Sequence, residues 1–413
     1  MLSELFFKNG FLLYIVGGYV RNALMDGCST DVDLAGAATS DEVIGFLKSS
    51  EFTAAVVNKK LGTLLIKHKS GQNFEYTTFR SENYLKGGSH SPASVKFVTD
   101  IRVDAKRRDF TANAIYYDIK NKKIIDFYGG IEDIKNKVLR AVETPQFVFE
   151  SDGLRILRFI RLAAELRFKP DPHTLEVAVK CKSQLKDISH ERFKKEFLLI
   201  INADSKHINA TQAQAHIKAL ELFNSFEIWL FVMPALKPYL KTLSNKSFVL
   251  FNKAPPSLRL PALLQDIFTA LKIEPTRQII NLVAGHKGLM LNANEVDEIS
   301  KILTAQNALT KYKDLRLFIL EYAFVITKLI EFLKLSKTHA KLEEVYTNMK
   351  KEGAPFCLKD LKINGNDIKK HLPHIKFNNY AGILTKTLHY AVKYPQHNNK
   401  NALLEYVKTM NNE

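Results

Sequence analysis

The pattern of hydrophobic residues changes once along the chain, near Pro145, and this change constrains the fold more than any other feature. The first roughly 140 residues mix helical stretches with short strand-like runs such as FLLYIVGG, GTLLIKH and NFEYTTFR. After Pro145, runs such as GLRILRFIRLAAELRF repeat with the helical period, and strand signals become rare. The sequence therefore predicts an α+β fold, with a mixed sheet and helices first and an all-helical remainder after it.

Composition indicates the kind of partner and the compartment. Sixty Lys and Arg against 43 Asp and Glu leave a net charge of +17, which favours a polyanionic partner, although a solvated lysine-rich surface has the same composition. The three cysteines lie far apart without metal-ligand spacing, as expected in a reducing cytoplasm. No secretion signal is evident, and the longest apolar run is interrupted by Glu321. We expect a cytoplasmic protein without a membrane partner.

Two aspartates, Asp31 and Asp33, stand two positions apart in the strand-like run TDVDL. Side chains at i and i+2 of a strand share one face, so we expect the two carboxylates to project together. Neighbouring carboxylates repel unless a cation neutralises them, and Mg²⁺ prefers oxygen ligands of this kind. We therefore expect Asp31 and Asp33 to bind magnesium for phosphoryl transfer, with Glu75 as a third catalytic carboxylate. Taken alone, the pair is also compatible with a solvated turn or a helix cap.

Gly17 and Gly18 follow the run FLLYIV and precede VRNALMDG, which has the pattern of a helix start. Amides exposed at such a turn bind phosphate, and Arg21 is placed to pair with it. Strand, paired glycine, helix with arginine, aspartate pair and later carboxylate follow one another in this order. The series resembles the nucleotidyltransferase superfamily of the DNA polymerase beta type.

More narrowly, several motifs resemble the class II tRNA nucleotidyltransferase and bacterial poly(A) polymerase family. They are GGYVRNAL, VDLA, LGTLLI, EYTTFR, RRDFTANA and DFYGGIEDIKNKVLRAV, and they occur in the family's order between residues 12 and 200. The resemblance implies a polymerase-beta-type head, followed by helical neck, body and tail domains. We expect these at residues 1–142, 143–200, 201–305 and 306–413, with the tail binding tRNA.

The resemblance also implies roles for two later motifs. In RRDFTANA, Arg108 and Asp109 would bind the phosphates and ribose of the incoming nucleotide, whereas a salt bridge at a helix end is the alternative. In SDGLRILR, Asp152 and Arg155 would act as a protein template for the base, whereas an ordinary i,i+3 ion pair is the alternative. The other residues expected to contact the nucleotide are Asn113, Arg158 and Arg161.

A carboxylate beside a guanidinium can select bases by their edges. Cytosine N4 and adenine N6 both donate a hydrogen bond next to a ring nitrogen that accepts one, so a single acceptor and donor pair fits either base. Uracil and guanine present a carbonyl oxygen at that position, which would leave the carboxylate unpaired. The template would therefore accept C and A and reject U and G.

Three further observations compare the chain with its family. Asn22 stands where the family usually has Asp, and Ser151 stands where it usually has Glu. The segment SHERFKKEF at residues 189–197 resembles an element that holds the neck helices, so Glu191, Arg192 and Glu196 are expected to be structural. The proline-containing segment NKAPPS at residues 252–257 has the composition of a linker.

The choice among family members rests on shorter segments. The region FRSENYLKGGSHSPASVKF resembles the flexible loop needed for switching from C to A, and its full length disfavours a CC-only enzyme, although residues 85–92 differ chemically from the usual loop. Gln265 replaces the histidine of a phosphohydrolase signature, which disfavours that activity. We expect addition of C, C and A to the 3′ end of tRNA from CTP and ATP, with pyrophosphate released. A bacterial poly(A) polymerase and a non-catalytic RNA-binding protein are the alternatives.

Overall fold

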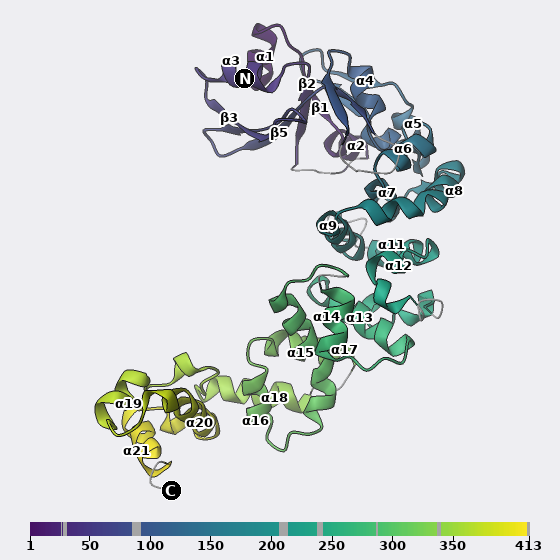
Figure 1. Cartoon of the computed structure of the whole chain (residues 1–413). Helices are drawn as coiled ribbons and strands as arrows, with labels where there is room; N and C mark the ends of the chain where they lie inside the picture. Colours follow the sequence, from purple (N-terminus) through teal and green to yellow (C-terminus); the bar gives the residue numbers. More distant parts are fainter. Residues whose placement is uncertain are drawn as a thin grey trace. The chain divides into compact units, whose positions relative to one another are not determined.

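Figure 1 shows the computed structural model of the chain, which describes residues 1–25, 27, 31–84, 92–205, 214–237, 243–285, 288–336 and 340–410. The chain forms two compact units, Met1–Pro234 and Ala235–Glu413. The first unit combines a sheet with helices, and the described part of the second contains helices and 3₁₀ turns but no strand. The predicted α+β class is confirmed, while the finer division into head, neck, body and tail stays a prediction. Within the described ranges, no helix is long and apolar enough to cross a membrane.

A seven-stranded mixed sheet forms the centre of the first unit, in the order β3-β4-β5-β2-β1-β8-β9. Neighbouring strands run antiparallel except β2 and β5, which run parallel. The strands are β1 (Leu13–Val16), β2 (Asp33–Gly36), β3 (Phe52–Asn58), β4 (Thr63–His68), β5 (Asn73–Thr78), β8 (Ile115–Asp118) and β9 (Lys123–Asp126). A separate hairpin consists of β6 (Arg80–Asn83) and β7 (Ser94–Phe97).

Short helices accompany the sheet. They are α1 (Leu2–Lys8), α2 (Gly18–Leu24), α3 (Ser40–Leu47), α4 (Ile101–Lys106) and α5 (Gly130–Asn136). Apolar side chains of α1 and α3, among them Phe6 and Val43, pack with Leu64 and Tyr76 of the sheet in one buried cluster. Helix α3 begins with a capping box, in which Thr39 Oγ1 accepts from the Glu42 amide and the Glu42 carboxylate accepts from the Thr39 amide.

Helices make up the rest of the first unit. They are α6 (Pro145–Ser151), α7 (Leu154–Glu165), α8 (Pro172–Lys180), α9 (His190–Ile201), α11 (Ala215–Ser225) and α12 (Trp229–Val232). A two-stranded parallel ladder joins β10 (Val138–Leu139), which precedes α6, to β11 (Lys169–Pro170), which follows α7. Beside the ladder, the Arg140 guanidinium pairs with the carboxylates of Asp133 and Asp171. The segment that contains α6 and α7 is therefore held at both of its ends.

The second unit is a series of helices. They are α13 (Arg259–Ala270), α14 (Arg277–Ala284), α15 (Ala293–Leu309), α16 (Leu315–Glu321), α17 (Ile326–Leu335), α18 (Ala340–Lys351), α19 (Gly365–His371), α20 (Tyr380–Lys393) and α21 (Lys400–Met410). The predicted linker at residues 252–257 is wrong, because this segment lies inside the unit as two 3₁₀ turns. The buried Asp266 carboxylate holds the first turn by accepting from the amides of Leu250 and Phe251.

Candidate active site

Three adjacent strands bring Asp33 next to the paired glycines and to Glu75. Strand β1 ends at Val16, which faces Asp33 in the antiparallel register, and Asp33 is aligned with Glu75 in the parallel β2–β5 register. Both carboxylate side chains remain open to solvent. Asp31 precedes the strand instead of lying within it, so the shared face of the two aspartates stays a prediction.

The charge around Asp33 fits a cation-binding role. Desolvation by the surrounding protein, followed by the nearby carboxylates of Asp31 and Glu75, raises the pKa of Asp33 to about 6. Oxygen ligands crowded in this way suit a hard divalent cation, which would relieve their repulsion. Among the residues that the structure describes, no three His, Cys, Asp or Glu side chains form a set that could hold a metal ion.

Gly17 forms the turn between β1 and α2, with φ of 75° and ψ of −132°. This conformation is open to glycine and strained for other residues. A Cβ atom added at Gly17 would lie 3.8 Å from Oδ2 of Asp33 and 3.8 Å from a guanidinium nitrogen of Arg108. The turn therefore stands directly between a carboxylate and an arginine that the sequence assigned to the same site.

Two side chains, Tyr116 and Asp104, hold the Arg108 guanidinium in place. Its Nε donates to the Tyr116 hydroxyl at 2.8 Å, and its Nη2 lies 3.2 Å from Asp104 Oδ2. Burial disfavours the charged guanidinium, but Tyr116 and Asp104 outweigh burial and raise the pKa of Arg108. Asp104 was missed by the sequence reading, although its place in IRVDAKRRD, three and four residues before two arginines, is a usable signal.

Arg21 lies in the interior, beside the turn that the sequence predicts to bind phosphate. Its side chain donates to Oδ1 of Asn22 and of Asn113. Burial, opposed in part by Glu165 and Asp109, lowers the pKa of Arg21 to about 10. Asn113 in turn donates to Asp109 Oδ1 at 3.0 Å, so Arg21 reaches Asp109 through an amide. Triphosphate binding by Arg21 remains a prediction.

Asp109 is paired with the arginine in the middle of α7. Arg158 Nε and Nη2 lie 2.8 Å and 2.7 Å from Asp109 Oδ2. Burial opposes ionisation of Asp109, but Arg158 and the Asn113 amide outweigh it and hold the pKa well below its usual range. Asp109 is thus an ionised, buried acceptor that joins the RRD motif to α7.

The two residues expected to template the base are close in sequence but bind different partners. Asp152 lies just before α7, where its Oδ1 accepts from the Leu154 amide and its Oδ2 accepts from Arg192 at 2.7 Å. Arg155 donates to the Arg107 carbonyl at 2.6 Å and to Ser151 Oγ at 3.1 Å. The alternative of a simple Asp152–Arg155 ion pair therefore finds no support among these bonds. Base templating stays a prediction.

The third arginine of α7 has carboxylate partners on both sides. Arg161 Nε donates to Glu196 at 2.6 Å, and its Nη1 donates to Glu165, and all three side chains are buried. This arrangement agrees with a structural role for Glu196, while the expected nucleotide contact of Arg161 stays a prediction. Glu191, the other acidic residue of that motif, is exposed in the first turn of α9.

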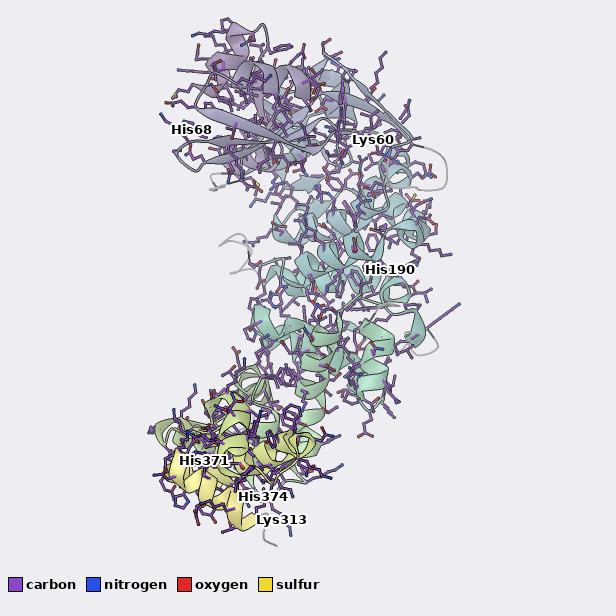
Figure 2. All side chains as sticks on the ribbon, turned by 60° about the vertical axis from the view of Figure 1, so that its left-hand side comes forward. Lys60, His68, His190, Lys313, His371 and His374 are labelled. Atoms are coloured by element: carbon purple, nitrogen blue, oxygen red, sulfur yellow. The ribbon has the colours of Figure 1, made fainter. Side chains whose placement is uncertain are left out.

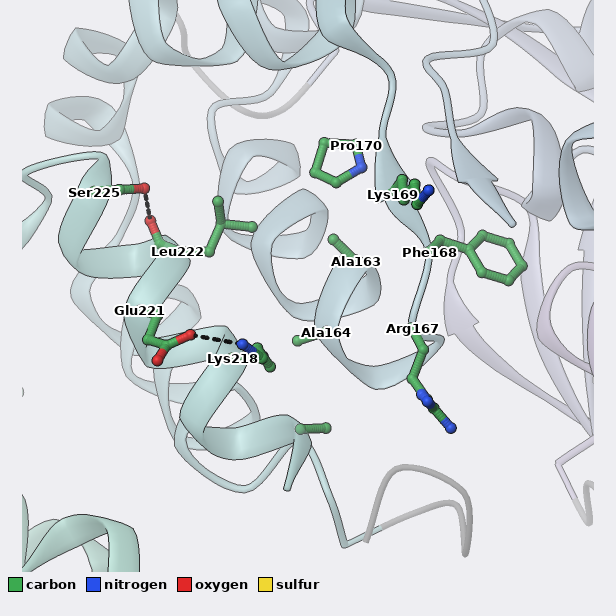
Figure 3. Close-up of a pocket in the computed structure, with 11 residues that line it drawn as sticks. Ala163, Ala164, Arg167, Phe168, Lys169, Pro170, Lys218, Glu221, Leu222 and Ser225 are labelled. Carbon is green, nitrogen blue, oxygen red and sulfur yellow. Dashed lines mark hydrogen bonds and ion pairs between the residues drawn. The ribbon is translucent and has the colours of Figure 1, made fainter. Parts of the chain in front are cut away.

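Two further features lie apart from the residues described above. The predicted flexible loop at residues 85–92 lies outside the described residues except for Pro92. A cavity of about 610 Å³ opens between the end of α7 and α11, lined by residues such as Ala163, Arg167 and Leu222 (Figure 3). None of its lining residues belongs to the predicted site, so this cavity is separate from the chemistry described above.

The fold is that of a nucleotidyltransferase, and residues 13–140 match the poly A polymerase head domain family. The chain is 29% identical over 384 residues to the CCA-adding enzyme of Staphylococcus epidermidis, covering 88% of this chain and 85% of that protein. It is 30% identical over 319 residues to the CCA-adding enzyme of Staphylococcus aureus strain MRSA252, covering 76% and 70%. The chain belongs to the family of CCA-adding enzymes.

Solved structures agree with the fold. The Bacillus stearothermophilus CCA-adding enzyme in complex with CTP aligns over 100% of this chain and 96% of its own, with a TM-score of 0.75 and 24% identity. A tRNA nucleotidyltransferase complexed with a primer tRNA and an incoming ATP analog aligns over 86% of this chain and 100% of its own, with a TM-score of 0.60 and 20% identity.

Proposed function

We propose that this chain adds C, C and A to the 3′ end of tRNA, using CTP and ATP and releasing pyrophosphate. The observation that carries the proposal is the junction in the head where Asp33, the Gly17 turn and the Arg108 guanidinium meet. The proposal is supported by membership in the family of CCA-adding enzymes and by solved relatives described as complexes with CTP, with ATP and with a primer tRNA. This family membership favours CCA addition over polyadenylation as the activity.

The charge of the chain suits an RNA substrate. The net charge of +17 draws contributions from both units, as the side chains of Lys60 in the first and Lys313 in the second illustrate (Figure 2). Positive surface of this kind attracts the phosphate backbone without reading its sequence. An enzyme that acts on every tRNA needs recognition of this general kind.

Enzymes of this family use a divalent metal ion, and we propose magnesium here, held by Asp31 and Asp33 with Glu75 beside them. When bound, such an ion neutralises the carboxylates and stabilises the charge that develops on the phosphate oxygens. Asp33 must be ionised to serve as a ligand, and a bound cation favours that ionised form over the raised pKa of the metal-free carboxyl. The carboxylates of Asp31, Asp33 and Glu75 are the groups that fit a divalent cation here.

The remaining roles follow from what each side chain can reach. The Gly17–Gly18 turn and Arg108 bind the triphosphate, since the turn and the guanidinium lie beside Asp33. Asp109, oriented by Arg158 and Asn113, accepts from the sugar hydroxyl. Asp152 and Arg155 select the base, while Arg21, which Asn113 holds, binds the triphosphate together with the turn. Holding the nucleotide by these groups aligns its α-phosphate with the 3′ end of the RNA.

An incorporation assay on tRNA that lacks its 3′ CCA tests the proposal. We expect CMP to be added first and AMP last, with loss of both when Asp33→Ala replaces the carboxylate. Runs of AMP without CMP would instead identify a poly(A) polymerase. Titration calorimetry adds a separate measurement: CTP binding with the same affinity with and without Mg²⁺, together with no incorporation, would identify a non-catalytic RNA-binding protein.

A further inference from the structure

The buried carboxylate of Glu82 has no part in the chemistry described so far. It lies on β6 with a side chain only 5% exposed, and it accepts three hydrogen bonds. Arg80 Nε and Arg107 Nη1 donate to Oε1 at 2.6 Å and 3.4 Å, and the Tyr84 hydroxyl donates to Oε2. Three donors on one buried acid make it the centre of a local network.

This network continues to a second buried acid. Arg107 Nε donates to Asp104 Oδ1 at 2.9 Å, and the Arg80 amide donates to the same oxygen at 3.1 Å. Asp104 is fully buried, and although burial opposes its ionisation, Arg107 and Arg108 lower its pKa to about 2. Two carboxylates thus hold three guanidinium groups, so the removal of one negative charge would leave Arg80 and Arg107 to repel each other.

The backbone of Arg107 links this network to α7, the helix that carries Arg155. Its carbonyl oxygen accepts from Arg155 Nη2 at 2.6 Å, and the two residues are 48 positions apart in the sequence. The other bonds of Arg155 run to Val148 and Ser151, which lie in the preceding helix, α6. The Arg107 carbonyl is therefore the acceptor through which the head orients the Arg155 guanidinium.

Tyr84 is a further member of the network. Its hydroxyl donates to Glu82 Oε2, and its pKa is raised first by burial and then by Glu82. Lys60, labelled in Figure 2, donates to the Pro92 carbonyl at 2.8 Å, in the same unit.

We infer that Glu82 is a positioning residue for base selection, because it holds Arg107 in the place from which its carbonyl orients the Arg155 guanidinium. The inference rests on the proposed function, in which Arg155 reads the base. A base edge is distinguished by one donor or acceptor, so a small rotation of the guanidinium is enough to weaken the distinction. Glu82 itself touches no substrate.

Selectivity measured on Glu82→Gln tests the inference. The substitution keeps the size of the side chain and removes its charge, so we expect the ratio of kcat/KM for CTP to that for UTP to fall by about tenfold, the effect of one lost charge-assisted hydrogen bond. Glu51→Gln is the matched control, since Glu51 pairs with Lys69 and His68 at the surface of the same unit. The control is expected to discriminate as the wild type does.

Tyr84→Phe removes only the hydroxyl that donates to Glu82 and keeps the ring, so it serves if Glu82→Gln does not fold. We expect the same loss of selectivity to a smaller degree. A Glu82→Gln or Tyr84→Phe enzyme that distinguishes CTP from UTP as well as the wild type, even with a lower melting temperature, would overturn the inference. Absence of CMP addition by the wild type would instead overturn the proposed function, so the two failures are distinguishable.

Discussion

The Arg192 guanidinium binds the Asp152 carboxylate at 2.7 Å, and the two residues lie 40 positions apart. Asp152 is half-buried and precedes the first turn of α7, where its other oxygen accepts from the Leu154 amide. The carboxylate that is expected to read the base is thus held in place from both sides. Arg192 comes from α9, so the start of that helix contributes to the candidate active site.

Arg192→Ala should impair nucleotide selection more than stability. Asp152 would lose its charged partner, and we expect kcat/KM for CTP to fall about tenfold because the base would be aligned less well. The pair is partly exposed, so its loss should cost only about 1 kcal/mol or less of unfolding free energy. Arg277→Ala, which breaks the surface pair with Asp297, is the control. Equal loss of activity in both variants would contradict the role.

Asp33 should make the metal-free protein less stable as the pH rises. Its folded pKa of about 6 exceeds the ordinary value of 3.8, so the folded state binds the proton more tightly. This contribution to stability is complete below pH 3.8 and is lost as the pH rises through 6. With a chelator present, Asp33→Asn should therefore melt at a higher temperature than the wild type at pH 7.5, with a smaller difference at pH 4.

The size of this effect is limited by solvent, because the Asp33 side chain remains partly open. We expect a gain on the order of 1 kcal/mol or less, and thermal melts at the two pH values measure it. Glu51→Gln gives the opposite sign, since hydrogen bonds from Lys69 and His68 lower the pKa of Glu51. An Asp33→Asn protein less stable than the wild type at pH 7.5 would argue against crowded carboxylates at this position.

Asp109→Asn should destabilise the protein at neutral pH. The folded pKa of Asp109 lies below 3.8, so its contribution is present above that value and is lost as the pH falls through the folded pKa. Loss of the Arg158 partner should cost about 2 to 3 kcal/mol at pH 7, because the carboxylate is buried while the arginine is partly exposed. Urea unfolding at pH 7 and pH 3 measures this, and a difference that does not shrink at the lower pH would contradict it.

Gly17→Ala should reduce both stability and activity. The backbone of Gly17 has φ of 75°, which costs an alanine about 1 to 2 kcal/mol, and the turn lies against Asp33 and Arg108. Gly45→Ala is the matched control, because Gly45 lies inside α3 with nothing within 4 Å of an added Cβ. That control should be stabilised by about 0.5 to 1 kcal/mol through better helix propensity. Similar effects of both substitutions would contradict a special role for the turn.

Local pattern was enough to predict the strand, the turn and the helix at Gly17 and Gly18. The same is true of the change to helices near Pro145, because each depends on residues close in sequence. The NKAPPS segment was misread for the same reason: its prolines end helices, but the chain just before it is held by Asp266 of α13, which accepts from the amides of Leu250 and Phe251.

The site was predictable where motif and register coincide, and less so where partners come from afar. The alignment of Asp33 with Glu75 follows from the order of the strands. The bond between Asp152 and Arg192, by contrast, joins residues 40 positions apart. Arg21 shows the limit most clearly. Its motif predicts a phosphate contact, which stays untested, and no local pattern reveals its amide partners Asn22 and Asn113.

The ladder of Val138–Leu139 with Lys169–Pro170 has a mechanical consequence. The Lys169 amide donates to the Lys137 carbonyl at 2.7 Å, and the Asp171 amide donates to the Leu139 carbonyl at 3.0 Å. A pivot between residues 140 and 168 could not move β11 away from β10 without breaking these bonds, so the two ends of the stretch carrying Asp152 and Arg155 should move together. Whatever bending accompanies each round of nucleotide addition should then leave these two ends together.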